Sequence, residues 1–279
     1  MGGIRATTSD SCRRCAVRNA GTLLYRRKMA HWFDLLRVLV DRDMKLLYKR
    51  STLGIAWTLI SPLLQLAVFS FLFRSVVPLN IPKFSSFAFS GLLIWSWSQT
   101  ALFKSTGLIT TNKALIRQPN FPTAILPVVT TMTGLIHFVL ALPVLIIFLA
   151  IDGVHLNSVL LLLPLLMIIQ FLLTVSFAYP LAALNVTFRD TQHTLGVVLQ
   201  MMFYLTPIFY DINSVPKQFQ MFYYLNPMVS LIEAYRAILL KGMQPDWPAL
   251  LILSLVVAAI LPIGLGIFRR QSDHFVEEL

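Results

Sequence analysis

The sequence contains few acidic residues, and it lacks the motifs by which proteins hold ATP or a catalytic metal. Only 12 of the 279 residues are Asp or Glu, against 23 Lys and Arg. None of the 12 glycines is followed by lysine, so the chain has no G-x4-G-K-[ST] loop for phosphate groups. It also has no HExxH motif and no pair of carboxylates deep in an apolar run. These absences predict a protein that does not hydrolyse ATP, is not an enzyme, and binds no cofactor or metal of its own.

Cysteine is nearly absent as well. Cys12 and Cys15 form a single CxxC motif, whereas a structural zinc site needs four ligands. We interpret the motif as incidental, with a redox or metal role as the alternative. It lies in a leader, residues 1–28, that is basic and has no apolar periodicity, so we expect this leader to be disordered.

Long hydrophobic runs dominate the rest of the chain. Hydrophobic residues make up 57% of the sequence and the mean hydropathy is +0.73, whereas a soluble domain has an apolar share of about 45–50%. The excess lies in six runs, each near or above the roughly 20 residues that a helix needs to cross a bilayer. The six runs are Ile55–Val77, Ser86–Gly107, Ala124–Ala150, Ser158–Leu184, His193–Asp211 and Ala249–Phe268. They predict an all-α polytopic membrane protein with six transmembrane helices, whose single membrane domain occupies residues 29–279.

The basic charge follows the positions of these runs. If the amino terminus is inside, 18 of the 23 Lys and Arg fall on the inner side of the membrane. This asymmetry matches the preference of cytoplasmic loops for basic residues. It predicts that both termini are cytoplasmic, and it accounts for the net charge of +11 without nucleic-acid binding.

Residues 31–50 have the pattern of an amphipathic helix that lies in the membrane interface, with Arg42 on its polar face. Asp43 breaks the pattern because it points into the apolar face. A bare carboxylate there is costly, so we expect Asp43 to have a cationic partner, with Arg50 as the simplest candidate. A solvent-facing acid on a tilted helix is the alternative.

Two turns on the inner side contain candidate functional residues. A short helix is expected from Asn112 to Arg117, because Pro119 and Pro122 follow it. Leu115 and Ile116 would then be exposed beside the basic side chains, which suits docking of a partner, and an ordinary basic loop is the alternative. The residues of this surface are Asn112, Lys113, Leu115, Ile116 and Arg117.

The second turn holds Arg189 and Asp190, which have the residue types of a salt-bridged latch. A plain topology anchor is the alternative for Arg189. His137 lies near the middle of the third run with no acidic residue nearby. We interpret it as a neutral, hydrogen-bonded histidine, with a transport role as the alternative.

The outer segment between the fifth and sixth runs is too polar to cross a bilayer. We expect short re-entrant or interfacial helices there, the second running from Asn226 to Gly242 with Glu233 and Arg236 three residues apart. A cluster of aromatic residues precedes it: Phe219, Phe222, Tyr223 and Tyr224. These side chains are buried against neighbouring helices, inserted in the outer leaflet, or turned toward a pore.

Five short motifs in the second half of the chain together resemble the ABC-2-type permeases. They are Phe188-Arg189-Asp190, Thr206-Pro207-Ile208 with Tyr210, a proline shortly after, Leu225-Asn226-Pro227-Met228, and Tyr235-Arg236. Their order and spacing are most similar to those of the permeases that export lipid-linked polysaccharides such as O-antigen, capsule or teichoic acid. The resemblance covers about residues 31–279, which makes Met29 an alternative start.

The resemblance implies a channel-forming subunit in the cell inner membrane. It would act as a homodimer with two copies of a separate ABC ATPase, which binds ATP and Mg and moves a lipid-linked polysaccharide outward. The Asn112–Arg117 helix would dock in a groove of that ATPase. Candidate channel or gate aromatics are Trp95, Trp97, Tyr204, Phe209, Tyr210, Phe222, Tyr223 and Tyr224. For the two tryptophans, we favour packing or an interfacial position, with a place along a sugar path as the alternative.

Two other functions remain open at this stage. An exporter of a small drug or lipid would share the fold and the ATPase. A membrane-embedded transferase acting on polyprenyl lipids would need charged residues clustered at one surface. Neither Arg189 with Asp190 nor Glu233 with Arg236 makes a metal or general-acid set, so the transferase is disfavoured.

Overall fold

The structure is a computed structural model of the chain. It describes residues 32–47, 49, 53–73, 81–119, 121–155, 157–272 and 275. The described residues form helices joined by short connections, and they contain no strand. The leader and Arg50 lie outside the described residues, so the expectations for them stay predictions.

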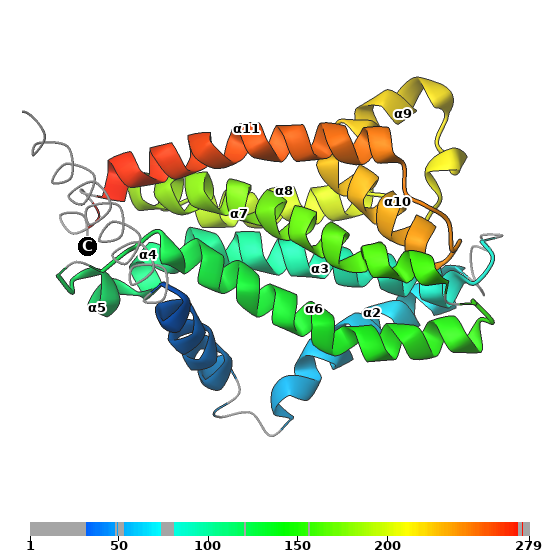
Figure 1. The fold of residues 1–279 in the computed structure, drawn as a ribbon, viewed down its shortest axis with the longest axis horizontal. Helices are drawn as coiled ribbons and strands as arrows, with labels where there is room; N and C mark the ends of the chain where they lie inside the picture. Colours follow the sequence, from blue (N-terminus) through cyan, green and yellow to red (C-terminus); the bar gives the residue numbers. More distant parts are fainter. Residues whose placement is uncertain are drawn as a thin grey trace, which may run out of the picture.

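Four long helices run side by side and form the centre of the molecule (Figure 1). They are α3 (Phe84–Thr106), α6 (Ile125–Ile151), α7 (Leu163–Thr187) and α11 (Trp247–Ser272). Helix α3 packs against α6 and α7, and α7 packs against α11. Helix α3 is the most enclosed of the four, because it is buried along most of its length.

Three helical segments are long and apolar enough to cross a membrane: Ile125–Ile151, Ser158–Thr187 and Trp247–Ser272. The second consists of the 3-10 turn η3 (Ser158–Leu162) followed by α7. Helices α2 (Trp57–Phe71) and α8 (Thr191–Leu205) have 15 residues each, fewer than the roughly 20 that a span needs. The prediction of an all-helical membrane protein is therefore confirmed, and that of six spans remains a prediction.

The fifth predicted run extends too far. It was expected to reach Asp211, whereas α8 ends at Leu205 and Thr206 has extended backbone angles, φ −82° and ψ 135°. The cause is Pro207, because its ring disfavours a helical conformation at the preceding residue.

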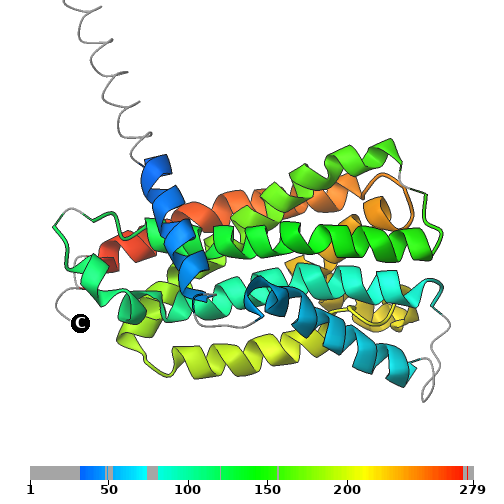
Figure 2. The same ribbon diagram turned by 90° about the horizontal axis from the view of Figure 1, so that it is seen from below.

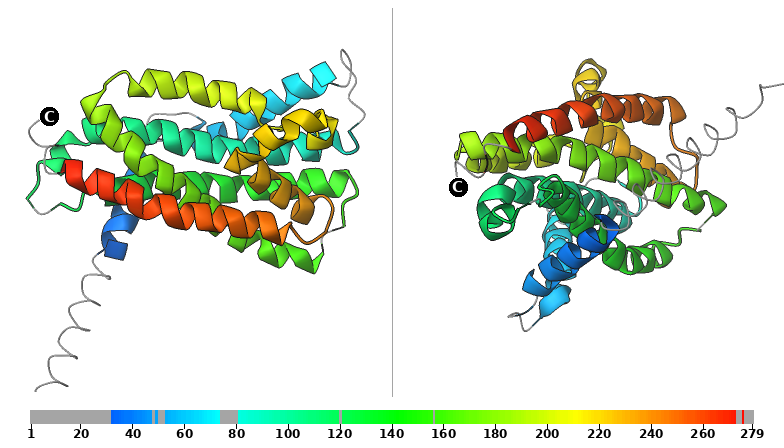
Figure 3. Two further views of the ribbon diagram at one scale, coloured as in Figure 1. Left: turned by 90° about the horizontal axis from the view of Figure 1, so that it is seen from above. Right: turned by 60° about the vertical axis from the view of Figure 1, so that its left-hand side comes forward.

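The two ends of the bundle carry different short elements. At one end, here called the α5 end, lie α4 (Leu108–Thr111), α5 (Lys113–Ile116) and the final turn of α11 (Figure 1). The helix of residues 32–47 crosses the bundle near this end (Figure 2). The opposite end, the α9 end, carries α9 (Lys217–Tyr224) and α10 (Pro227–Leu239). Helices α2 and α8 lie along the same face of the molecule (Figure 3).

Close packing of α11 on α7 depends on a glycine. A Cβ atom at Gly264 would lie 2.7 Å from the backbone oxygen of Ser176 and 3.0 Å from a ring carbon of Pro180. Both are parts of α7 that cannot rotate away. One helical half-turn further, a Cβ atom at Gly266 would meet nothing within 4 Å.

This pair gives a test of the packing. Gly264→Ala is expected to lower the free energy of unfolding by about 1–3 kcal/mol, because the added methyl group forces the helices apart. Gly266→Ala is the matched control and should leave stability unchanged or raise it by up to about 1 kcal/mol, because alanine is the better helix former. The measurement is thermal unfolding of the purified protein in detergent. Equal midpoints for the two variants would contradict the packing.

Candidate functional site

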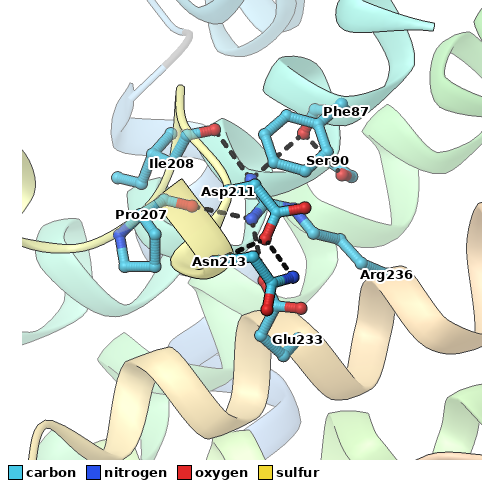
Figure 4. Close-up of polar contacts among 8 residues, drawn as sticks. All are labelled: Phe87, Ser90, Pro207, Ile208, Asp211, Asn213, Glu233 and Arg236. Carbon is cyan, nitrogen blue, oxygen red and sulfur yellow. Dashed lines mark hydrogen bonds and ion pairs between the residues drawn. The ribbon is translucent and has the colours of Figure 1, made fainter. Parts of the chain in front are cut away.

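A buried arginine joins three elements at the α9 end. Arg236 of α10 is 1% exposed. Its Nη1 donates to the backbone oxygen of Pro207 at 2.7 Å and to Glu233 Oε1 at 3.1 Å. Its Nη2 donates to the backbone oxygens of Ile208 at 2.7 Å and Phe87 at 3.4 Å (Figure 4). One side chain therefore connects α10 to α3 and to the turn after α8.

The guanidinium group also fits tightly against α3. Its central carbon lies 3.5 Å from the centroid of the Phe87 ring, a cation–π contact. A Cβ atom at Gly91 would lie 3.0 Å from Nη2, so the glycine leaves room for the arginine. We call this group the arginine clamp; it consists of Phe87, Gly91, Pro207, Ile208, Glu233 and Arg236.

The clamp satisfies backbone groups of the turn that follows α8. The carbonyls of Pro207 and Ile208 lie beyond the end of α8 at Leu205, and Arg236 donates to both. Unpaired backbone groups are costly in an apolar environment. Beside them, Asp211 accepts from the backbone N–H and the side-chain amide of Asn213 (Figure 4). The sequence placed Glu233 and Arg236 three residues apart but gave no sign of these carbonyl partners.

The start of α10 agrees with the sequence. Pro227 occupies its first position, and the side chain of Asn226 accepts from the N–H of Met228 at 3.0 Å. Asn226 also donates to Thr206 Oγ1 at 3.0 Å, which attaches this cap to the end of α8. The LNPM motif thus begins α10 and also fixes it against the turn that the clamp holds.

Helix α9 exposes most of its aromatic side chains. Phe219, Phe222 and Tyr224 are exposed, Phe222 to 73%. Tyr223 is half-buried, and its hydroxyl lies 3.3 Å from that of Tyr210. Within the chain, burial against neighbouring helices is therefore ruled out for the three exposed rings. For these rings, insertion in the outer leaflet and a position at a pore are the two remaining interpretations.

The other candidate channel aromatics divide into two groups. Tyr204 is exposed on α8, whereas Trp95, Trp97 and Phe209 are buried. The indole N–H of Trp97 donates to the backbone oxygen of Thr131 at 3.1 Å, so this ring packs α3 against α6. The structure favours packing over a channel role for the buried three.

At the α5 end, the face of α5 that is exposed is not the face that the sequence predicted. Ile116 is 5% exposed and belongs to an apolar cluster that Leu115 also contacts. Lys113, Ala114 and Arg117 are exposed. The prediction that Ile116 is exposed is wrong, and Leu115 is half-buried, because burial of apolar side chains against neighbouring helices lowers the free energy.

Asp43 has the cationic partner that the sequence demanded. Its Oδ1 accepts from Arg42 Nη2 at 2.7 Å and Nε at 3.1 Å. The same Nη2 donates to Asn112 Oδ1 at 2.9 Å. The partner found among the described residues is thus Arg42, while Arg50 lies outside them. The contact ties the helix of residues 32–47 to the residue between α4 and α5.

Arg189 and Asp190 do not form the expected latch. Both are exposed in the turn between α7 and α8, and no ion pair joins them to any residue that the structure describes. Exposed ion pairs gain little free energy in water, which accounts for their separation. Across the described ranges, no three His, Cys, Asp or Glu side chains lie close enough to hold a metal ion.

Long apolar helices with exposed basic side chains gathered at one end are features of a polytopic membrane protein. Residues 34–240 match the profile of the ABC-2 type transporter family. The chain therefore belongs to the ABC-2 type transporter family.

Three relatives span almost the whole chain. The chain is 34% identical over 255 residues to the O-antigen export system permease protein RfbA of Myxococcus xanthus, covering 91% of this chain and 98% of that one. It is 29% identical over 259 residues to the RfbA protein of Klebsiella pneumoniae, covering 92% and 100%. It is 23% identical over 251 residues to the polysialic acid transport protein KpsM of Escherichia coli, covering 86% and 96%.

The arginine clamp gives a second test. Arg236→Met removes the donors of two buried carbonyls, and each acceptor left unpaired costs about 1–3 kcal/mol. The thermal unfolding midpoint in detergent should fall well below that of the wild type. Lys241→Met is the matched control, because it removes an exposed cation just after the same helix. A midpoint for the Arg236 variant equal to that of the control would contradict the clamp.

Proposed function

We propose that the protein is the permease subunit of an ATP-driven exporter that moves a lipid-linked polysaccharide across the cell inner membrane. The observation that carries the proposal is the similarity to the O-antigen permeases, which extends over 98% and 100% of their length. The match is thus to whole permeases and not to a shared segment.

A separate ABC ATPase supplies the energy in this proposal, because the chain has no phosphate-binding loop. Two ATPase subunits, which bind ATP and Mg²⁺, act with two copies of this chain. The helix of residues 32–47 and the last turn of α11 lie at the α5 end. If both termini are cytoplasmic, this end faces the ATPase.

The docking surface consists of Lys113, Ala114 and Arg117, the exposed side of α5. Its buried side explains how a push would be transmitted. Ile116 packs in the apolar cluster that includes residues of the 32–47 helix, α7 and α11. The Arg42–Asn112 hydrogen bond adds a polar connection between the same elements. Displacement of α5 would therefore move several helices together.

The polymer path lies between the two copies of the homodimer, and the aromatics of α9 stand at its exit. Phe222 and Tyr224 are exposed there, while α10 is fixed by the arginine clamp. Aromatic faces suit sugars because a flat apolar surface accommodates successive residues of a sliding polymer. Helix α9 is thus the sugar-facing part of the outer end in this proposal.

The proposed function predicts a cellular phenotype. Deleting the gene should remove the polysaccharide from the cell surface and leave lipid-linked polymer inside the cell. Gel analysis of surface and intracellular fractions measures both, and the wild-type gene should restore the surface polymer. Unchanged surface polysaccharide together with increased sensitivity to small toxic compounds would instead identify an exporter of small molecules.

The docking surface predicts a separate loss. Reversing both charges by Lys113→Glu with Arg117→Glu should reduce co-purification with the ATPase at least about tenfold, equivalent to about 1.4 kcal/mol. The matched control is Arg269→Glu with Arg270→Glu, an equal charge change at exposed sites of the same end. Both proteins should unfold at the wild-type temperature. An equal effect of the two double variants would refute docking at α5.

A further inference from the structure

A groove runs along the side of the bundle from the α5 end to the middle of α6. It consists of two adjoining cavities of about 430 and 440 Å³, and both are lined by Leu47 and Lys104. The helix of residues 32–47, α2, α3 and α6 provide its walls. Helix α2 begins only at Trp57, so it covers the half nearer the α9 end (Figure 2). We call this feature the Lys104 groove.

The lining is more polar than lipid chains would require. Three polar side chains of the walls, Ser61, Gln65 and Thr100, make no hydrogen bond within the described part of the chain. Polar side chains in the tightly packed interior behave differently: the buried Thr174 donates to the backbone oxygen of Gln170 at 2.8 Å. Unpaired polar groups are costly beside hydrocarbon, so a polar occupant accounts for them.

The groups beside these three suit the recognition of sugar hydroxyls. Gln99 accepts from the indole N–H of Trp95 at 2.9 Å, which leaves its amide donors available. Trp57 stands at the edge with 49% of its surface exposed and provides a flat apolar face. Amide and hydroxyl groups next to an aromatic face are a suitable combination for a carbohydrate.

The α5 half of the groove carries the positive charge. Arg42, Asp43 and Lys104 line it, so the charges sum to one positive. Arg42 is engaged by Asp43 and Asn112. Lys104 makes no hydrogen bond or ion pair within the part of the chain that the structure describes. A lysine ammonium at the end of a polar groove is suited to a phosphate group.

We propose that the Lys104 groove binds the phosphate and the first sugars of a lipid-linked glycan, an inference that rests on the proposed function. The phosphate contacts Lys104, and the sugars extend toward Gln99 and Trp57. The lipid chain leaves the groove past Leu46, which is exposed at the rim. Lys104 would also attract an ordinary anionic phospholipid. Such a lipid has no sugar hydroxyl groups to bind the neutral polar side chains of the other half of the groove.

The test uses the full-length chain in phosphatidylcholine nanodiscs and a radiolabelled polyprenyl diphosphate that carries a disaccharide. Lys104→Gln should weaken binding at least about tenfold, equivalent to about 1.4 kcal/mol. Lys104→Arg should restore most of the affinity, because it keeps the charge. Arg270→Gln, which removes an exposed cation of the same end outside the groove, should bind as the wild type does. Equal binding by the Lys104→Gln and Arg270→Gln proteins would overturn the proposal.

A competition experiment and a second variant distinguish a lipid-linked glycan from an ordinary phospholipid as the source of the phosphate. Gln99→Leu should abolish the preference for the disaccharide-bearing probe over the same polyprenyl diphosphate without sugar. If phosphatidylglycerol displaces the probe as well as unlabelled probe does, the groove is a phospholipid site and the proposal is wrong. Restored surface polysaccharide in cells carrying the wild-type gene, with unaltered probe binding by Lys104→Gln, would refute the groove and leave the proposed function intact.

Discussion

A turn inside an apolar bundle places backbone carbonyl groups where no water can donate to them, and the α9 end of this molecule depends on how that problem is solved. Helix α8 stops at Leu205 because Pro207 follows, and the chain then turns. The guanidinium group of Arg236 supplies donors to the buried carbonyls of Pro207 and Ile208 in this turn, while its charge meets Glu233 and the face of Phe87. A lysine has a single ammonium group and cannot spread its donors over partners on both sides. The position therefore demands arginine.

The need for every polar group in the bundle to have a hydrogen-bond partner also distinguishes the interior of the bundle from the groove. Inside, hydroxyl groups bond to the helix that carries them, as Ser105, Thr131 and Thr174 do by donating to carbonyls four residues back. Such helices can be surrounded by lipid or by other helices without a further partner. Along the Lys104 groove this internal pairing is incomplete. The difference marks where the molecule is adapted to a polar guest and not only to the bilayer.

The sequence predicted the long elements well because a membrane imposes a length and a composition. The runs Ala124–Ala150 and Ala249–Phe268 lie within three or four residues of α6 and α11 at both ends. The sequence did not predict which side of a short helix faces the interior. A four-residue helix such as α5 has too few residues for periodicity to show which side faces inward, so Ile116 was placed on the wrong face.

Contacts between distant segments were also beyond the reach of sequence patterns. The carbonyl partners of Arg236 lie 28, 29 and 149 residues away along the chain. Arg42 donates to both Asp43 and Asn112, and Asn112 lies 70 residues away from it along the chain. Neither distance corresponds to a helical period, so no local pattern could indicate these pairs. The i, i+3 spacing of Glu233 and Arg236 was visible, but it indicated only that ion pair and none of the carbonyl partners.

Helix α3 connects the two ends of the molecule. It carries Phe87 of the arginine clamp near its start and Lys104 near its end. At 1.5 Å per residue, its 23 residues span about 34 Å. Because most of the helix is buried and closely packed, we expect it to move as a rigid body. In the proposed exporter, a push on α5 would thus reach the outer end as movement of α3 against the turn that Arg236 holds. The clamp, by bonding to α3 and to that turn at once, is where such movement would be resisted or released.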